Sequence, residues 1–147
     1  GVMNMEGIRN ILNAGAITVS SIYEISPFQN ALVVVEMKGE DLLELFGQMA
    51  AVHGEGLSGA KLVISKDGKL LSAKVGGRNI EPEKLYKVAT IDYLAEGNDR
   101  LEAFKKAVNK TIPSDAILRD LFIDYVKRCE KQGKPVRAKI EGRIVEQ

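Results

Sequence analysis

The chain has 147 residues, 45% of them hydrophobic and 28% charged, with a formal net charge of +1. This length fits one domain with one buried core, and the mixing of basic and acidic residues along the chain argues against a nucleic-acid polymer as partner. The only cysteine, Cys129, rules out a disulfide or a thiolate metal cluster within the chain, and no apolar run is long enough to predict a transmembrane segment.

The N-terminal segment predicts the end of a strand and then a helix. The strand stops at Asn4, and the polar turn after it brings this asparagine and Arg9 close enough to face one pocket. Thr18 is expected to cap a helix that ends before Pro27, because the residue before a proline avoids helical backbone angles. Phe28 emerges directly after this stop.

Two strongly apolar segments follow. Residues 31–37 form a continuous apolar run, which is typical of a central strand buried on both faces. Residues 40–53 carry apolar side chains at helical spacing and end at Gly54, which predicts an amphipathic helix. His53 lies in its last turn, and we expect it to be a solvated helix-end residue because a lone histidine cannot build a two-metal site.

The middle of the chain predicts antiparallel strands. Residues 61–64 and 69–75 flank the pair Asp67 and Gly68, the strongest short hairpin signal in the sequence. A second glycine turn leads on to a strand that begins at Tyr86. This meander, together with the helices, predicts an α+β fold with a mixed or antiparallel sheet and packed helices.

The C-terminal third predicts two helices and a closing strand. Apolar residues recur at helical spacing up to the break at Pro113, and Ser114 or Asp115 is expected to cap a longer helix that runs to about Gln132. Residues 138–145 are expected to form a closing strand with a glycine bend. The long helix is expected to bury one stripe of side chains: Ile117, Leu118, Leu121, Phe122, Tyr125, Val126 and Cys129.

The strand that begins at Tyr86 opens into a loop with the residue types of a ligand site. Tyr93 and Asp99 lie at or just past the strand end, where open sheets commonly bind ligands. A tyrosine ring can stack on a flat heterocycle, and a carboxylate can accept both hydroxyls of a ribose diol. The alternative interpretation is that Tyr93 closes the core and Asp99 caps the next helix.

Four segments in chain order make a specific combination of motifs. They are Asn-Met-Glu-Gly-Ile-Arg over residues 4–9, the stretch from Ile-Thr at residue 17 to Ser-Pro-Phe-Gln-Asn-Ala-Leu-Val-Val over 26–34, Tyr-Lys-Val-Ala-Thr-Ile-Asp-Tyr-Leu-Ala-Glu-Gly-Asn-Asp over 86–99, and a closing helix over 119–125 followed by Ile-Glu-Gly-Arg-Ile over 140–144. Together they resemble the C-terminal domain of the 5'-nucleotidase family, the metallophosphoesterases that include UDP-sugar hydrolases. The resemblance implies a single domain of this fold over residues 1–147.

The resemblance also implies a substrate-binding site, with no catalytic residue in this chain. A nucleobase is expected to lie between the rings of Phe28 and Tyr93, with the ribose hydroxyls on Asp99. Further polar contacts to base and phosphate are expected from a set of three side chains: Asn4, Arg9 and Asn30.

Three residues depart from the family pattern. Asn98 and Arg100 flank Asp99 where glycines are usual, so a backbone that needs positive φ is less free there, and Arg100 could select a different ligand. Glu6 replaces a glycine of the first motif and would repel a phosphate if its carboxylate pointed inward.

Hydrolysis in the resembled enzymes needs two divalent metal ions, which are held by a separate metallophosphoesterase domain. We therefore expect no cofactor in this chain, no activity of the chain alone, and a catalytic domain in the same or a separate polypeptide. The resemblance implies a nucleotide or nucleoside ligand and a periplasmic or cell-surface location. Two alternatives remain open: a free-standing, non-catalytic nucleotide-binding module and a structural domain with a decayed pocket.

Overall fold

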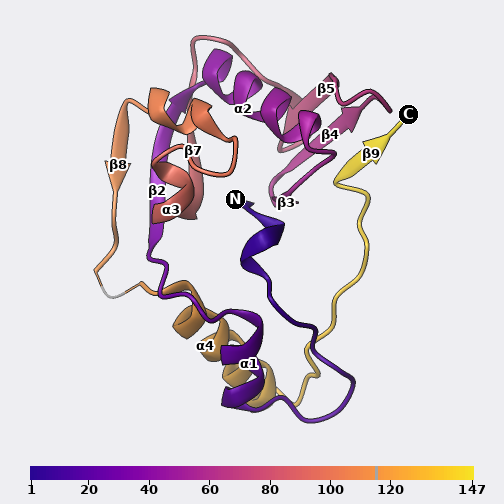
Figure 1. The fold of residues 1–147 in the computed structure, drawn as a ribbon, viewed down its shortest axis with the longest axis vertical. Helices are drawn as coiled ribbons and strands as arrows, with labels where there is room; N and C mark the ends of the chain where they lie inside the picture. The colour runs from indigo at the N-terminus through magenta and orange to yellow at the C-terminus, as the bar shows by residue number, and fades with distance from the viewer. Residues whose placement is uncertain (115) are drawn as a thin grey trace.

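The computed structural model describes residues 1–114 and 116–147, and its strands form three sheets. Figure 1 shows the larger sheets with helix α2 (Gly39–Ala51) at one end of the molecule, and helices α1 (Val19–Ile25) and α4 (Leu118–Lys131) together at the other. The three-stranded sheet has the order β7-β2-β8, from β2 (Leu32–Lys38), β7 (Leu85–Ile91) and β8 (Asn109–Thr111). The four-stranded sheet has the order β6-β5-β4-β9, from β4 (Ala60–Ile64), β5 (Leu70–Val75), β6 (Arg78–Asn79) and β9 (Ile144–Glu146). The two-stranded sheet pairs β1 (Val2–Met3) with β3 (Gly56–Leu57).

Strand β2 is the centre of its sheet, as predicted. It pairs antiparallel with β7, from Leu32 opposite Ile91 to Lys38 opposite Leu85, and with β8 on its other edge. The expectation that both faces are buried is wrong, because burial alternates along the strand. Val33, Val35 and Met37 are fully buried, whereas the residues between them are half-buried, so the core lies on one face of this sheet.

Helix α2 supplies the largest share of the helical core. Its apolar stripe is buried as the sequence predicts, through Leu42, Leu45, Phe46, Met49 and Ala50. Gly39 at its start is required by a close approach, since a Cβ there would lie 2.0 Å from the carbonyl oxygen of Glu81. The helix ends at Ala51, and His53 lies beyond it with φ of 58° rather than in the last turn.

The predicted hairpin around Asp67 and Gly68 is confirmed, because β4 and β5 pair antiparallel. Strand β6 continues this meander, but β7 leaves it and pairs with β2 in the other sheet. The chain makes this transfer along the start of α2, where Gly39 N donates to Lys84 O over 2.8 Å and Glu40 N to Pro82 O over 3.0 Å.

The segment after Asp99 is not the helix that the spacing predicts. It forms a short 3₁₀ helix, η2 (Glu102–Lys106), and then strand β8. Leu101 and Phe104 are fully buried, but Val108 is 57% exposed. The apolar spacing therefore reflects one buried turn, after which the chain adds a strand to the free edge of β2.

Helices α1 and α4 pack on each other away from the main core. Thr18 caps α1 as predicted, since its hydroxyl accepts from Ser21 N over 3.1 Å. The residue before α4 is Ile117, which makes no side-chain cap, so Ser114 lies too early to serve as one. The other expected cap, Asp115, lies outside the described residues.

The expected buried stripe of α4 is only half-buried. Leu121 is 39% exposed and Tyr125 42% exposed, and the buried residue of this helix is a charged one, Arg119. The short helix α1 is too small to cover the apolar face of a helix twice its length.

The C-terminal tail forms less strand than expected. Only β9 is regular, and it pairs in parallel with β4. Ile140, which the sequence places in this strand, is fully exposed, and Gly142 bends the chain with φ of 65°. Of the helices in the described residues, none combines the length and the apolar character needed to cross a bilayer.

Candidate functional site

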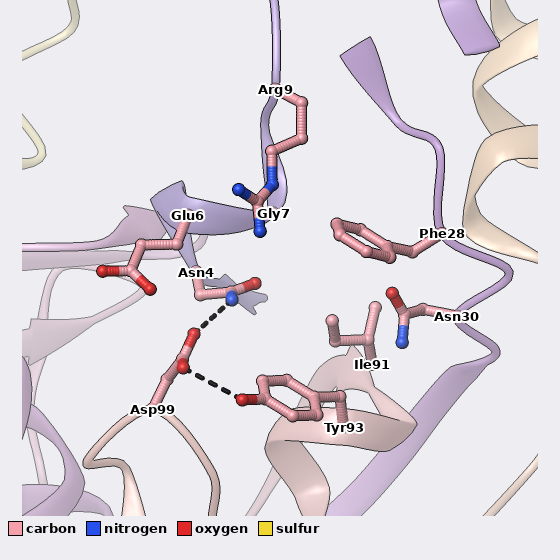
Figure 2. Close-up of a pocket in the computed structure, with 9 residues that line it drawn as sticks. All are labelled: Asn4, Glu6, Gly7, Arg9, Phe28, Asn30, Ile91, Tyr93 and Asp99. Carbon is pink, nitrogen blue, oxygen red and sulfur yellow. Dashed lines mark hydrogen bonds between the residues drawn. The ribbon is translucent and has the colours of Figure 1, made fainter. Parts of the chain in front are cut away.

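A cavity of about 270 Å³ brings together all six residues predicted for the site. Three stretches supply them: the segment after β1, the loop between α1 and β2, and the end of β7 with the short helix α3 (Asp92–Ala95) and the loop that follows it. Figure 2 shows this arrangement. The lining consists of Asn4, Glu6, Gly7, Arg9, Phe28, Asn30, Ile91, Tyr93 and Asp99. Asn4 and Asp99, which are 95 positions apart in the sequence, thus line the same cavity.

The two aromatic rings border the same space. Phe28 is 44% exposed and Tyr93 43% exposed, so neither ring is part of the core. Figure 2 shows them on different sides of the cavity, with Phe28 above, Tyr93 below, and Ile91 and Asn30 between them at the right of the view. The alternative in which Tyr93 closes the core is therefore wrong. A capping role for Asp99 is also wrong, because Leu101 occupies the N-cap position of η2.

The Asp99 carboxylate is held by two donors. Asn4 Nδ2 donates to its Oδ2, and the Tyr93 hydroxyl donates to its Oδ1 over 3.2 Å. The hydrogen bond and charge of Asp99 raise the pKa of the Tyr93 hydroxyl, with a further contribution from Glu6. Because an ionised carboxylate offers about four lone-pair sites, Asp99 keeps acceptor capacity for a ligand.

The loop that carries Asp99 is held in the left-handed region. Asp99 has φ of 54° and Arg100 of 64°, after Gly97 with φ of 86°. The glycines of the family pattern predict a need for positive φ at Asn98 and Arg100. Arg100 and Asp99 itself have positive φ, whereas Asn98 does not. Asn98 instead braces the turn, since its Nδ2 donates to Tyr93 O over 2.8 Å.

Asn4 presents a buried acceptor beside the cavity. The residue is only 4% exposed, and its Oδ1 has no hydrogen-bond partner among the described residues. The hydrogen bond to Asp99 fixes the orientation of the Asn4 amide, because only its Nδ2 can donate to a carboxylate. An unsatisfied buried acceptor costs about 1–3 kcal/mol. A ligand N–H at this position would remove that cost.

Asn30 is fixed by a residue that the sequence analysis missed. Its Nδ2 donates to Asp92 Oδ1 over 2.9 Å, and Figure 2 shows the amide oxygen turned toward the cavity. Burial acts to raise the pKa of Asp92, but hydrogen bonds from Asn30 and from backbone groups, including Tyr93 N, lower it below its ordinary value. Asp92 stands directly before Tyr93 in the sequence, but its contact with Asn30 joins positions 62 residues apart, so local sequence does not reveal it.

Charges of both signs line the cavity. The guanidinium carbon of Arg9 lies 5.2 Å from the centroid of the Phe28 ring, and Figure 2 shows this group between Phe28 and Glu6. Figure 2 shows the Glu6 carboxylate near Asp99. Burial, and then the charges of Asp99 and Glu6, raise the pKa of the neighbouring Glu55, against a lowering hydrogen bond from Met5 N.

The described residues do not provide a metal centre. They contain no group of three or more His, Cys, Asp or Glu side chains that could hold a metal ion. The Nδ1 atom of His53 instead lies 3.0 Å from Oε2 of Glu146. The groups in the cavity can stack on a flat ring, accept N–H groups and bind a diol.

Comparison with known proteins points to one family. A family model described as 5'-nucleotidase, C-terminal domain, matches residues 1–106, a range that includes every residue lining the cavity. A protein named UshA from Salmonella pullorum is 32% identical over 103 residues, or 67% of this chain and 19% of that protein. The cell wall protein Lmo0130 of Listeria monocytogenes is 34% identical over 159 residues, or 97% of this chain and 20% of that protein.

A solved structure supports the same assignment. The 5'-nucleotidase precursor of Thermus thermophilus matches with a TM-score of 0.84 and 27% identity, over 99% of this chain and 31% of that chain. This chain therefore spans about a fifth of the length of the curated relatives it matches, and about a third of the solved one.

Proposed function

Because this chain belongs to the family of 5'-nucleotidase C-terminal domains, we propose that it is the substrate-recognition domain of a nucleotide-hydrolysing enzyme. Its ligand is a nucleoside or nucleotide. Hydrolysis is carried out by a metallophosphoesterase domain with two divalent metal ions, in the same or a separate polypeptide. The observation that carries the proposal is the cavity in which Phe28, Tyr93 and Asp99 meet.

The nucleobase occupies the space between the two rings. Both rings are about half exposed before any ligand binds, so they offer open faces for stacking. Stacking of a base on an aromatic side chain contributes about 1–3 kcal/mol. The oxygens of Asn4 and Asn30 accept N–H groups on the edge of the base, and the first of them gains the partner that it lacks.

The ribose lies at the acidic end of the cavity. Asp99 is held in place by Asn4 and Tyr93, and it has acceptor sites left for two hydroxyls. Hydrogen bonds to a charged acceptor contribute about 1.5–3 kcal/mol. After the cost of association is subtracted, stacking and the diol contact together support a micromolar to millimolar ligand.

The proposed location rests on the relatives of the chain. One of them is named a cell wall protein, and the resemblance implies a periplasmic or surface enzyme. In the periplasm or at the cell surface, the domain meets nucleotides that are outside the cytoplasm.

Calorimetric titration of the chain with adenosine, AMP and UDP-glucose tests the proposal. We expect weak binding of one or more of these ligands, and its loss in Tyr93→Ala and Asp99→Ala. Tyr125→Ala and Asp124→Ala are matched controls, because they remove an equally exposed tyrosine and an exposed acid from α4. Equal affinity in the unmodified chain and the two cavity variants would remove the proposed site.

A further inference from the structure

Arg119 is a buried cation that contacts the segment carrying Phe28. It lies in the first turn of α4, outside the range of the family match, and is 6% exposed. Its Nη1 donates to Pro27 O over 3.2 Å. Its guanidinium carbon lies 3.8 Å from the centroid of the Tyr23 ring on α1, so the plane of the group is set by stacking.

The segment that Arg119 contacts has little structure of its own. Residues 26–30 are in neither a helix nor a strand. Among the described residues, the bond from Arg119 is the only hydrogen bond made by residues 27–29. The position of the backbone that carries the Phe28 ring therefore depends on how the carbonyl just before it is held.

The start of α4 also fixes the chain immediately after Phe28. Leu118 N donates to Asn30 O over 2.9 Å, and Leu32 N donates to Ala116 O over 2.7 Å. These bonds join backbone groups, so they hold the chain whatever the side chains are. Arg119 adds a side-chain hydrogen bond to the carbonyl just before Phe28, and its charged donor makes this bond stronger than a neutral one. The Phe28 ring itself lies against the Arg9 guanidinium, with its centroid 5.2 Å from the guanidinium carbon.

We propose that Arg119 is a positioning residue that holds the Phe28 ring at the edge of the cavity, ready to stack on the ligand. This inference rests on the proposed function of the cavity. Without Arg119, the Pro27 to Phe28 segment is free to move, and the ligand must order it on binding. Ordering one such side chain costs enough to weaken binding by about two- to tenfold.

Phe28→Trp provides a direct reporter, because the chain contains no tryptophan. We expect the fluorescence anisotropy of the introduced indole to fall when Arg119→Met is added, since methionine has similar length but cannot donate. Arg119→Lys keeps a charged donor and should restore part of the anisotropy. Arg128→Met removes an exposed cation from the same helix and should leave the anisotropy unchanged.

Adenosine affinity provides the second readout, measured in the chain with Phe28 intact. We expect Arg119→Met to weaken binding by about two- to tenfold and Arg128→Met to have no effect. Unchanged anisotropy together with unchanged affinity in a folded Arg119→Met chain would overturn the inference and leave the proposed function standing. Failure of the unmodified chain to bind would instead count against the proposed function, while the anisotropy would still test Arg119.

Arg119 is buried, so its replacement by methionine can prevent folding, which circular dichroism will show. Tyr23→Leu then decides the question, because Tyr23 is 46% exposed and its removal takes away the surface on which the guanidinium stacks. We expect a smaller fall in the anisotropy of the Phe28→Trp reporter in that chain. No fall in Tyr23→Leu would overturn the inference.

Discussion

Asp99 shows how much of the site depends on the placement of one carboxylate. It accepts hydrogen bonds from Asn4 and Tyr93, and its backbone lies in the left-handed region next to Arg100. Two consecutive non-glycine residues in this region are costly, at about 1–2 kcal/mol each. Such backbone strain persists only where surrounding contacts hold the residue in place, and it is typical of functional loops.

Glu6 is one of the three residues that depart from the resembled motifs, and it lines the cavity. It stands where the motif has a glycine, and its charge reaches both Tyr93 and Glu55. Arg9 is the cation that lines the same cavity, so a phosphate near it would also meet the negative charges of Glu6 and Asp99. The cavity should therefore favour a nucleoside over a nucleotide whose phosphate lies inside it.

We predict that Glu6→Gln tightens AMP binding relative to adenosine. Removing one like charge from a half-open cavity is worth roughly 1 kcal/mol, or about fivefold in affinity. Parallel titrations with AMP and adenosine, in the unmodified and variant chains, measure the ratio. Glu24→Gln on α1 is the control for loss of a negative charge. A ratio that Glu6→Gln leaves unchanged would mean that the phosphate does not approach Glu6.

At the scale of elements, α2 and α4 have similar apolar patterns but different roles. Leu45 of α2 is completely buried in the main core, whereas Leu121 of α4 is 39% exposed beside the short helix α1. The periodicity of a sequence shows that a helix has an apolar face. It does not show how much of that face the rest of the chain can cover.

We predict that Leu45→Ala destabilises the chain by about 2–5 kcal/mol, as is usual for a leucine in a packed core. Leu121→Ala, the matched substitution on α4, should cost less than about 1 kcal/mol. Urea unfolding followed by circular dichroism measures both free energies of unfolding. Similar losses in the two variants would show that α4 is as deeply packed as α2.

Asp92 links the end of β7 to the loop that carries Asn30. Burial acts to raise its pKa, but the hydrogen bonds that the carboxylate accepts outweigh this effect, so the pKa is lowered in the folded chain. A carboxyl group with a lowered pKa stabilises the folded state above its unfolded pKa of 3.8, and this stability is lost as the pH falls through the folded value.

We predict that Asp92→Asn flattens the acid limb of the stability profile. The free energy of unfolding should fall less steeply in this variant than in the unmodified chain between about pH 5 and pH 2. Urea titrations across this range provide the measurement, with Asp124→Asn on α4 as the control. An acid limb equally steep in all three chains would show that Asp92 does not contribute to it.

Much of the fold could be predicted from local sequence. The Thr18 cap, the hairpin at Asp67 and Gly68, the central strand β2 and the core stripe of α2 all depend on short-range patterns, and all are confirmed. Strand β8 was missed because three exposed residues have no strand pattern of their own and are held by the edge of β2.

At the scale of the whole molecule, the cavity lies where the helix pair meets the sheets. Phe28 comes from the loop that leaves α1, Tyr93 from the short helix α3 that follows β7, and Asp99 from the loop after α3. The motifs predicted these residues because each belongs to a local pattern. Asp92 and Arg119 could not be assigned roles in the same way, because their partners lie 62 and 92 positions away and only the fold brings them together.

The central claim is that Phe28 and Tyr93 hold one flat ring between them. Nuclear Overhauser effects between the base protons of bound adenosine and the ring protons of these two residues test it most directly. We predict effects from the base to both rings in the same complex, and none to the equally exposed ring of Tyr125. A complex at saturating adenosine with no contact between the base and either ring would contradict the account.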